Sequence, residues 1–160
     1  MYKFLIRFFV FVIAAAVGIS CDQTQVFGKY NAIPDAQWHK DSLVVFTVPV
    51  TDTLQNHNLR VNVRNETTYN YSNLWLFVEI IQPDGETMKD TFQMVLAEPS
   101  GKWLGDGIGK LKTRQAIFRR NVYFPVSGEY TVKIQHGMRE ETLRGIHDVG
   151  FSVEKVNYTD

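Results

Sequence analysis

Short runs of hydrophobic residues, alternating with polar ones, recur along the chain after its first forty residues. Residues 59–64 alternate strictly, so they are expected to bury three aliphatic side chains and to expose three polar ones. Turn signals such as Pro83-Asp84-Gly85 separate the runs, because Pro fixes φ and Gly readily takes a positive φ. We expect strands at residues 43–48, 59–64, 73–81, 87–96, 115–124, 130–135 and 149–153. Seven or eight short strands predict an all-β fold, a single antiparallel β-sandwich of immunoglobulin-like or jelly-roll-like type over residues 42–160.

The run at residues 73–81 is apolar at positions that point to both faces of a strand. Such a strand lies in the middle of a sheet that is covered on each side, or else it presents an aromatic outer surface. For Trp75, within this run, we favour burial in the core.

A different pattern precedes the domain. Lys3 and Arg7 come before ten apolar residues, 8–17, and the only cysteine of the chain, Cys21, follows shortly after. A membrane-spanning helix needs about 20 apolar residues, so this run is too short and has the proportions of a secretory signal. The arrangement resembles the lipobox of bacterial lipoproteins, although Gly18 stands where Leu is common. It implies that Cys21 becomes the acylated N-terminus, carrying chains such as palmitate.

This interpretation divides the chain into a lipoprotein signal peptide (1–20), a lipidated tether (21–41) and the sandwich (42–160). Residues 26–41 are expected to be irregular, with a turn at Pro34-Asp35. The alternative is an ordinary signal peptide that leaves Cys21 as a free thiol, a poor choice in an oxidising compartment. No acidic run follows Cys21, so we expect a protein that is anchored to a membrane through its lipid and faces the periplasm.

Composition and spacing argue against most chemistry. Without Lys3 and Arg7 the chain has 15 basic and 17 acidic residues, a net charge of −2, which does not suit nucleic-acid binding. The glycine-rich residues 101–110 match neither a P-loop nor a dinucleotide fingerprint, and they indicate a curved or bulged loop beside the core. The four histidines are scattered. We therefore predict no catalytic residues, no metal, no cofactor and no enzymatic activity.

Aromatic residues near turns and on strand faces are the more informative feature. Tyr71, Trp75 and Trp103 are candidate interaction anchors, since large rings dominate protein interfaces and also form platforms for sugars. The sequence leaves open whether Trp103 lies in the core or at the surface. Two hypotheses follow, a lipoprotein that binds other envelope proteins and, alternatively, a glycan-binding envelope lipoprotein.

Several sequence blocks together resemble the gliding-motility lipoprotein GldH family of Bacteroidetes. They are WHKD at 38–41, YSNLWLF at 71–77, GKWLGDGIG at 101–109, FPVSGEYTV at 124–132 and LRGIHDVG at 143–150. The resemblance implies a cell-envelope lipoprotein associated with the gliding apparatus and its linked secretion machinery. It carries over no catalytic residue, and Cys21 alone matches a functional position.

Two short segments resemble the three-residue acceptor pattern for O-glycosylation of exported proteins in that phylum. They are Asp41-Ser42-Leu43 and Asp52-Thr53-Leu54. We therefore expect Ser42 and Thr53 as candidate glycosylation sites, in positions where a loop or strand edge leaves room for a glycan.

Overall fold

The computed structural model describes residues 24–156, so the signal segment and Cys21 lie outside the described residues. The described chain folds into ten strands and one short 3-10 helix. The elements are β1 (Gln25–Ala32), η1 (Pro34–Ala36), β2 (Gln37–His39), β3 (Val44–Val50), β4 (His57–Glu66), β5 (Asn73–Ile81), β6 (Thr87–Val95), β7 (Leu111–Val122), β8 (Gly128–His136), β9 (Thr142–Arg144) and β10 (Ile146–Lys155).

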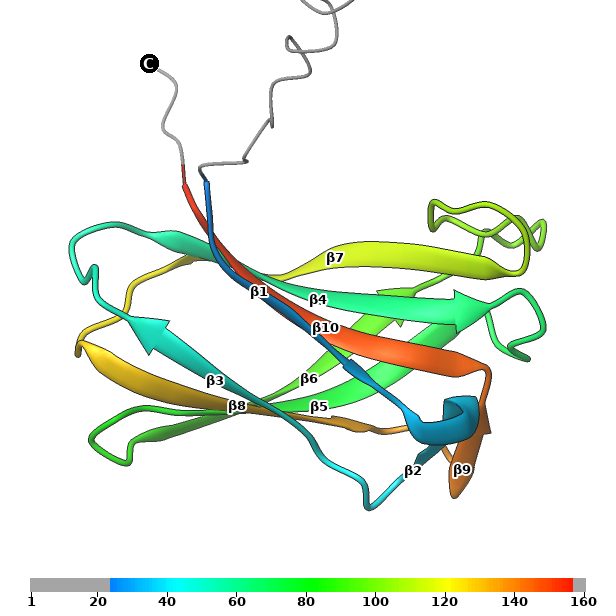
Figure 1. The fold of residues 1–160 in the computed structure, drawn as a ribbon, viewed down its shortest axis with the longest axis horizontal. Coiled ribbons are helices and arrows are strands. Elements are labelled where there is room, and N and C mark those ends of the chain that lie inside the picture. The colour runs from blue at the N-terminus through cyan, green and yellow to red at the C-terminus, as the bar shows by residue number, and fades with distance from the viewer. Residues whose placement is uncertain (1–23, 157–160) are drawn as a thin grey trace, which may run out of the picture.

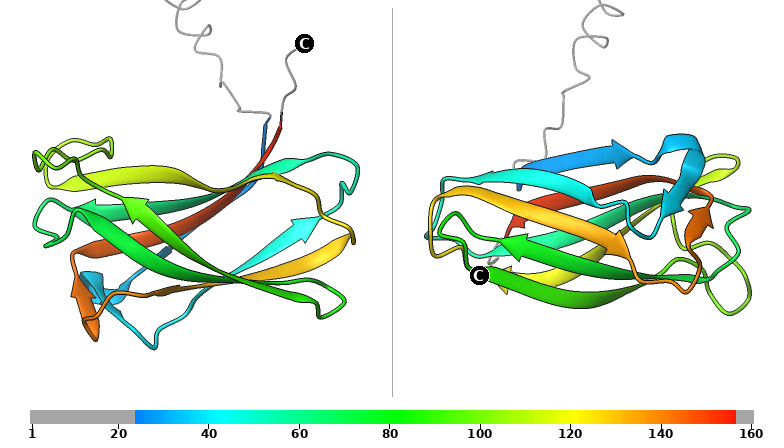
Figure 2. Two further views of the ribbon diagram at one scale, coloured as in Figure 1. Left: turned by 180° about the vertical axis from the view of Figure 1, so that it is seen from behind. Right: turned by 90° about the horizontal axis from the view of Figure 1, so that it is seen from below.

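Eight of the strands form two antiparallel four-stranded sheets (Figure 1). Sheet I has the order β1-β10-β4-β7 and sheet II the order β3-β8-β5-β6, while β2 and β9 pair as a small separate ribbon. The two sheets lie over one another as layers when the molecule is seen from behind (Figure 2). This arrangement confirms the predicted all-β sandwich.

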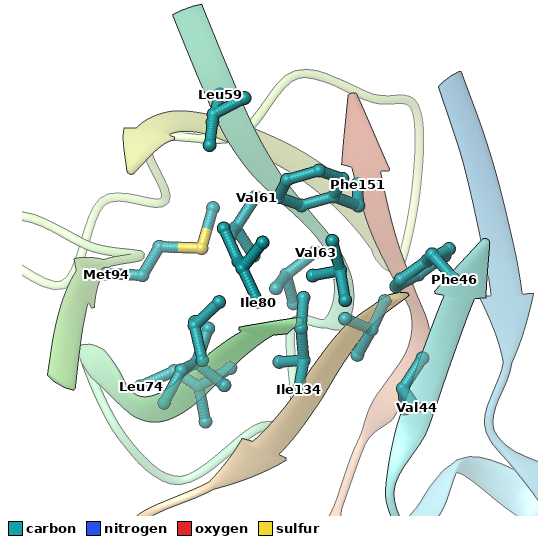
Figure 3. Packing of buried hydrophobic residues seen from close by; sticks show 14 of the residues in the cluster. Val44, Phe46, Leu59, Val61, Val63, Leu74, Ile80, Met94, Ile134 and Phe151 are labelled. Carbon is teal, nitrogen blue, oxygen red and sulfur yellow. The ribbon is translucent and has the colours of Figure 1, made fainter. Parts of the chain in front are cut away.

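The space between the sheets is filled by inward-pointing residues of β3, β4, β5, β6, β8 and β10 (Figure 3). Leu59, Val61 and Val63 enter from β4, and Phe151 of β10 lies 6.1 Å from Phe46 of β3, measured between ring centroids. Burying one such side chain contributes about 1.5–3 kcal/mol, so the core accounts for most of the stability of the sandwich. The inward positions are those that the alternating sequence pattern predicted.

The expected irregular tether at residues 26–41 is wrong. β1 pairs along its length with β10, and β2 pairs with β9, so the sandwich already begins at Gln25. β1 shows no hydrophobic alternation because it is an edge strand in which Phe27 alone is buried. Trp38, fully buried, anchors β2, and its indole nitrogen donates a hydrogen bond to the carbonyl of Ser42 at 2.8 Å.

Two strand ends also differ from the expectation. β3 does not stop at Pro49 but continues to Val50, and Pro49 pairs with Glu129. Pro lacks a backbone N–H, which an edge strand such as β3 tolerates because one side of it makes no ladder hydrogen bonds. β7 begins at Leu111, four residues before the predicted position, because these residues pair with the end of β4.

Candidate interaction face

The outer face of sheet II carries large apolar side chains that remain partly exposed. Alternation along β5 places Leu74 and Leu76 in the core and therefore turns Trp75 and Phe77 outward. We call this surface the apolar face. Its exposed large hydrophobic residues are Leu43, Val45, Trp75, Phe77 and Val95.

The core interpretation of Trp75 is thus wrong, since its side chain is 39% exposed and that of Phe77 is 48% exposed. β5 is apolar on both sides because one side faces the core and the other forms this surface. The Phe77 ring lies on the backbone of Gly137, where an added Cβ would come within 3.0 Å of the ring. The sequence analysis did not identify Phe77 as a residue of this face, nor Gly137 as its support. The available signal was the run at residues 73–81, which is apolar on both sides of the strand.

A hollow of about 430 Å³ opens beside Trp75 at one end of the apolar face. Tyr71, just before β5, and Asn73, its first residue, line the hollow on one side. Met138 and Arg139 line it from the loop after β8. The backbone N–H of Trp75 contacts the Met138 sulfur at 3.3 Å, and Gly137 donates a hydrogen bond to the Trp75 carbonyl at 2.7 Å. Two of the predicted anchors, Tyr71 and Trp75, therefore meet at one site.

Tyr71 is held in place by its neighbours. Its hydroxyl donates a hydrogen bond to Oε1 of Glu140 at 2.5 Å, and its ring meets that of Tyr69 edge-on at 5.6 Å. The hydrogen bond to Glu140 and the partial loss of solvent raise the pKa of Tyr71, so the phenol stays neutral at physiological pH. A fixed, neutral ring at the rim of the hollow loses little entropy when a ligand covers it.

A second hollow of about 320 Å³ lies on the other side of Phe77, between that ring and Leu43. Its floor is crossed by Glu79, which lies 3.0 Å from the Lys89 ammonium and 3.5 Å from that of Lys133. The hydrogen bond from Lys89 lowers the pKa of Glu79, which therefore stays charged. The apolar face thus combines two aromatic side chains with a bordering row of charges.

The outer face of sheet I has a different character, and we call it the paired face. Arg60 and Glu154 approach to 2.7 Å, and Arg64 and Asp148 to 3.1 Å. Between these pairs, the buried Asn62 amide donates a hydrogen bond to the Ser152 hydroxyl at 3.3 Å. Most polar groups of this face are therefore satisfied within the chain itself.

Trp103 lies on the loop between β6 and β7, where it forms a β-bridge with Ala97 and packs, partly buried, against the core. It does not line the hollow at Trp75. The expected curved loop is confirmed, since Gly101 and Gly107 have positive φ values of 85° and 143°. Gly105 lies so close to the Thr113 backbone that a Cβ there would come within 2.9 Å. The anchor role of Trp103 stays a prediction.

The predicted modification sites are not tested by the fold. Ser42 is exposed just before β3, and Thr53 is partly exposed in the loop between β3 and β4. Glycosylation at both positions stays a prediction. Within residues 24–156, no three His, Asp or Glu side chains converge as a metal site, and no helix is long and apolar enough to cross a membrane.

Comparison with known proteins identifies the family to which the chain is similar. Residues 25–153 match the GldH lipoprotein family. A gliding motility lipoprotein GldH homolog of Christiangramia forsetii is 40% identical over 92% of this chain and 94% of its own length. The gliding motility lipoprotein GldH of Flavobacterium johnsoniae is 38% identical over 91% of this chain and 94% of its own length. Among solved structures, a family GH115 4-O-methyl-alpha-glucuronidase is similar over 89% of this chain and 19% of its own, at 12% identity and a TM-score of 0.45, too distant to indicate function.

Proposed function

The chain belongs to the GldH lipoprotein family, a family of gliding motility lipoproteins of Bacteroidetes, and from this premise we propose that it works by binding other envelope proteins through the apolar face. Membership makes it a lipoprotein of the cell envelope. The proposal adds the mode of action, a protein–protein interaction, and the surface that carries it.

The observation behind the proposal is the pair Trp75 and Phe77 at consecutive outward positions of β5. Both rings are exposed, and a hollow lies on each side of them, so a partner could fill both hollows around the rings. Large exposed apolar side chains that lie close together often mark an interaction site, and Trp is among the residues that contribute most to interface energy. The bordering charges of Glu79, Lys89 and Lys133 would then set the orientation of the partner.

We further propose that the sandwich is held at the membrane by lipid on Cys21 and faces the periplasm. β1 begins at Gln25, four residues after Cys21, which leaves a short connection. Metabolic labelling with a fatty acid tests the anchor. The native chain should be labelled and the Cys21→Ala variant should not, and a Cys21→Ala chain that still carries label would refute acylation at this residue.

The interaction mode is tested by cross-linking in intact host envelopes, followed by mass spectrometry of the captured proteins. The test variant is the double substitution Trp75→Ser and Phe77→Ser. The matched control is Tyr30→Ser, which removes an aromatic ring that is 40% exposed on the paired face. We expect the double variant to lose partners that the native chain and the control both capture. Identical capture by all three proteins would contradict a role for the apolar face.

A glycan-binding function is the second candidate, and the hollow at Trp75 favours it. An aromatic ring there stands beside Asn73 and Arg139, side chains that can donate hydrogen bonds to sugar hydroxyls. Titration of the purified protein with host surface polysaccharides, followed by tryptophan fluorescence, distinguishes the two functions. A saturable change that is lost in Trp75→Ser would support glycan binding, and its absence beside intact cross-linking would leave the protein interaction.

A further inference from the structure

A second group of exposed apolar residues lies away from the apolar face, at one end of the sandwich. Val26 in β1 is 47% exposed, Leu54 in the loop after β3 is 90% exposed, and Tyr123 just after β7 is 56% exposed. Neither the core nor the proposed protein interface uses these three side chains. We call them the anchor-proximal residues, because the beginning of β1 lies among them.

Backbone and side-chain contacts tie this end to the first described residues. The N–H of Lys155 donates to the carbonyl of Thr24 at 2.8 Å, and that of Val156 donates to the carbonyl of Asn56 at 2.9 Å. The Lys155 ammonium reaches Asp52 at 3.6 Å. In Figure 1 the beginning of β1 lies beside the end of β10, next to the loop between β3 and β4.

The local structure holds these side chains outward. The backbone N–H of Leu54 donates to Oδ1 of Asp52 at 2.9 Å, an arrangement that closes a turn and leaves the leucine at its tip. At the end of β7, Asn121 has a positive φ of 53°, and its N–H donates to Oδ1 of Asn58 at 3.3 Å. Tyr123 follows two residues later and is exposed.

Chain length limits how far this end can be from the lipid. Cys21 precedes Gln25 by four residues, which span at most about 14 Å when fully extended. The polar headgroup layer of one leaflet is about 6 Å thick, half the difference between the whole bilayer and its hydrocarbon core. A sandwich attached so closely cannot stand far from the membrane surface, and the end that carries β1's first residue must be the nearer one.

We propose that the anchor-proximal residues contact the lipid surface and fix the orientation of the sandwich on the membrane. The inference rests on the proposed lipid anchor at Cys21. Leu54 enters the boundary between headgroups and acyl chains, and Tyr123, with an apolar ring and a polar tip, suits the same depth. The bilayer is the favoured occupant because the tether brings it there, whereas the apolar face on sheet II remains free for proteins.

The test uses the lipidated chain bound to vesicles of phosphatidylethanolamine and phosphatidylglycerol. Because the chain has one cysteine, which acylation occupies, a new cysteine is the sole free thiol and can be labelled specifically with an environment-sensitive fluorophore. The test variants are Leu54→Cys and, independently, Tyr123→Cys. The matched control is Ile108→Cys, which replaces a fully exposed aliphatic residue in the loop before β7, whereas Tyr123 follows the other end of that strand.

Flotation with the vesicles is measured first and reports the lipid anchor by itself. We expect floating protein whose labels at 54 and 123 emit at shorter wavelength and are quenched several-fold more by nitroxide lipids than the label at 108. Floating protein with equal, water-like signals at all three positions would overturn the membrane contact while leaving the anchor intact. A label at 54 that is shielded from both lipid and aqueous quenchers would also overturn it, in favour of a protein occupant. Protein that neither carries fatty acid nor floats would remove the anchor and this inference together.

Discussion

The two outer faces of the sandwich cover the same core but differ in how their side chains are paired. On the paired face, Arg60 and Arg64 each meet a carboxylate of β10, and Asn62 bonds to Ser152. On the apolar face, Trp75 and Phe77 project from β5 and stay 39% and 48% exposed. Most polar groups of the first face are already paired within the chain. A partner that covers the rings of the second face removes apolar surface from water, which contributes about 25 cal/mol per Å² before the cost of association. The contrast indicates which side of the sandwich is an interface.

The largest expected change in stability that tests this contrast comes from two adjacent residues, which lie on opposite sides of β5. Leu76 is fully buried, so Leu76→Ala is expected to lower the free energy of unfolding by about 2–5 kcal/mol. Phe77→Ala removes a larger side chain, but one that is 48% exposed and rests on Gly137, so we expect a smaller loss of about 1 kcal/mol. Chemical denaturation followed by tryptophan fluorescence measures both. If Phe77→Ala lowered the free energy of unfolding nearly as much as Leu76→Ala, the Phe77 ring would be part of the stabilising core and not a surface for a partner.

These two residues also show what could be predicted from the sequence. The bounds of β5 follow from the pattern at residues 73–81, and so does the expectation that apolar side chains occupy both of its sides. The pattern could not decide whether Trp75 and Phe77 face a second layer or solvent, because both environments accept apolar side chains. That decision depends on whether another segment of the chain packs over sheet II, a long-range fact that no local pattern contains.

The strands β1 and β2 were not predicted, for a related reason. In β1 only Phe27 is buried, because the other side of this edge strand faces solvent, so no alternation marks it as a strand. Trp38 lies in a strand that pairs with β9, about a hundred residues later in the chain, and its ring meets that of His136 in β8 at 5.3 Å between centroids. Turn chemistry was more reliable, since the positive φ of Gly101 and Gly107 follows directly from the density of glycine in that loop.

Mild acid provides a second test, because it acts on two buried histidines that belong to neither outer face. His136 and His57 are buried, and burial lowers the pKa of each below its ordinary value of about 6.5. The unfolded chain therefore binds more protons than the folded one as the pH falls below about 6.5, so stability is full above that pH and decreases below it. Melting curves at several pH values measure the slope. His136→Leu should flatten it.

Asn62 allows a test of how much the polar groups of the paired face stabilise the fold. Its side-chain oxygen is buried and has no hydrogen-bond partner within residues 24–156, a situation that costs about 1–3 kcal/mol. Replacing both members of the pair, by Asn62→Val with Ser152→Ala, should therefore leave stability unchanged or raise it by about 1 kcal/mol. Thermal melts of the single and double variants test this. A marked loss of stability in the double variant would show that the polar pair contributes more to the paired face than its geometry indicates.

The smallest expected effect concerns the charges themselves. Arg60 and Glu154 are 29% and 18% exposed, so a double-mutant cycle with Arg60→Gln and Glu154→Gln should give a coupling energy of about 1 kcal/mol, the upper end for such pairs. On the apolar face, Lys89 is 74% exposed, and Glu79 keeps Lys133 as a second partner when Lys89 is removed. The cycle with Lys89→Gln and Glu79→Gln should therefore give no measurable coupling.

The two cycles are compared by chemical denaturation at low and at high salt, since salt screens exposed charges more than partly buried ones. Coupling at Arg60–Glu154 that survives high salt would mean that the paired face is stabilised by the chain's own contacts. Equal coupling in both cycles would contradict the distinction, because the charges bordering the apolar face would then be committed to the fold and could not orient a partner. Weak coupling between Glu79 and Lys89 would mean that these residues and Lys133 can form ion pairs with a bound protein in place of those with each other, at little cost to the stability of the fold.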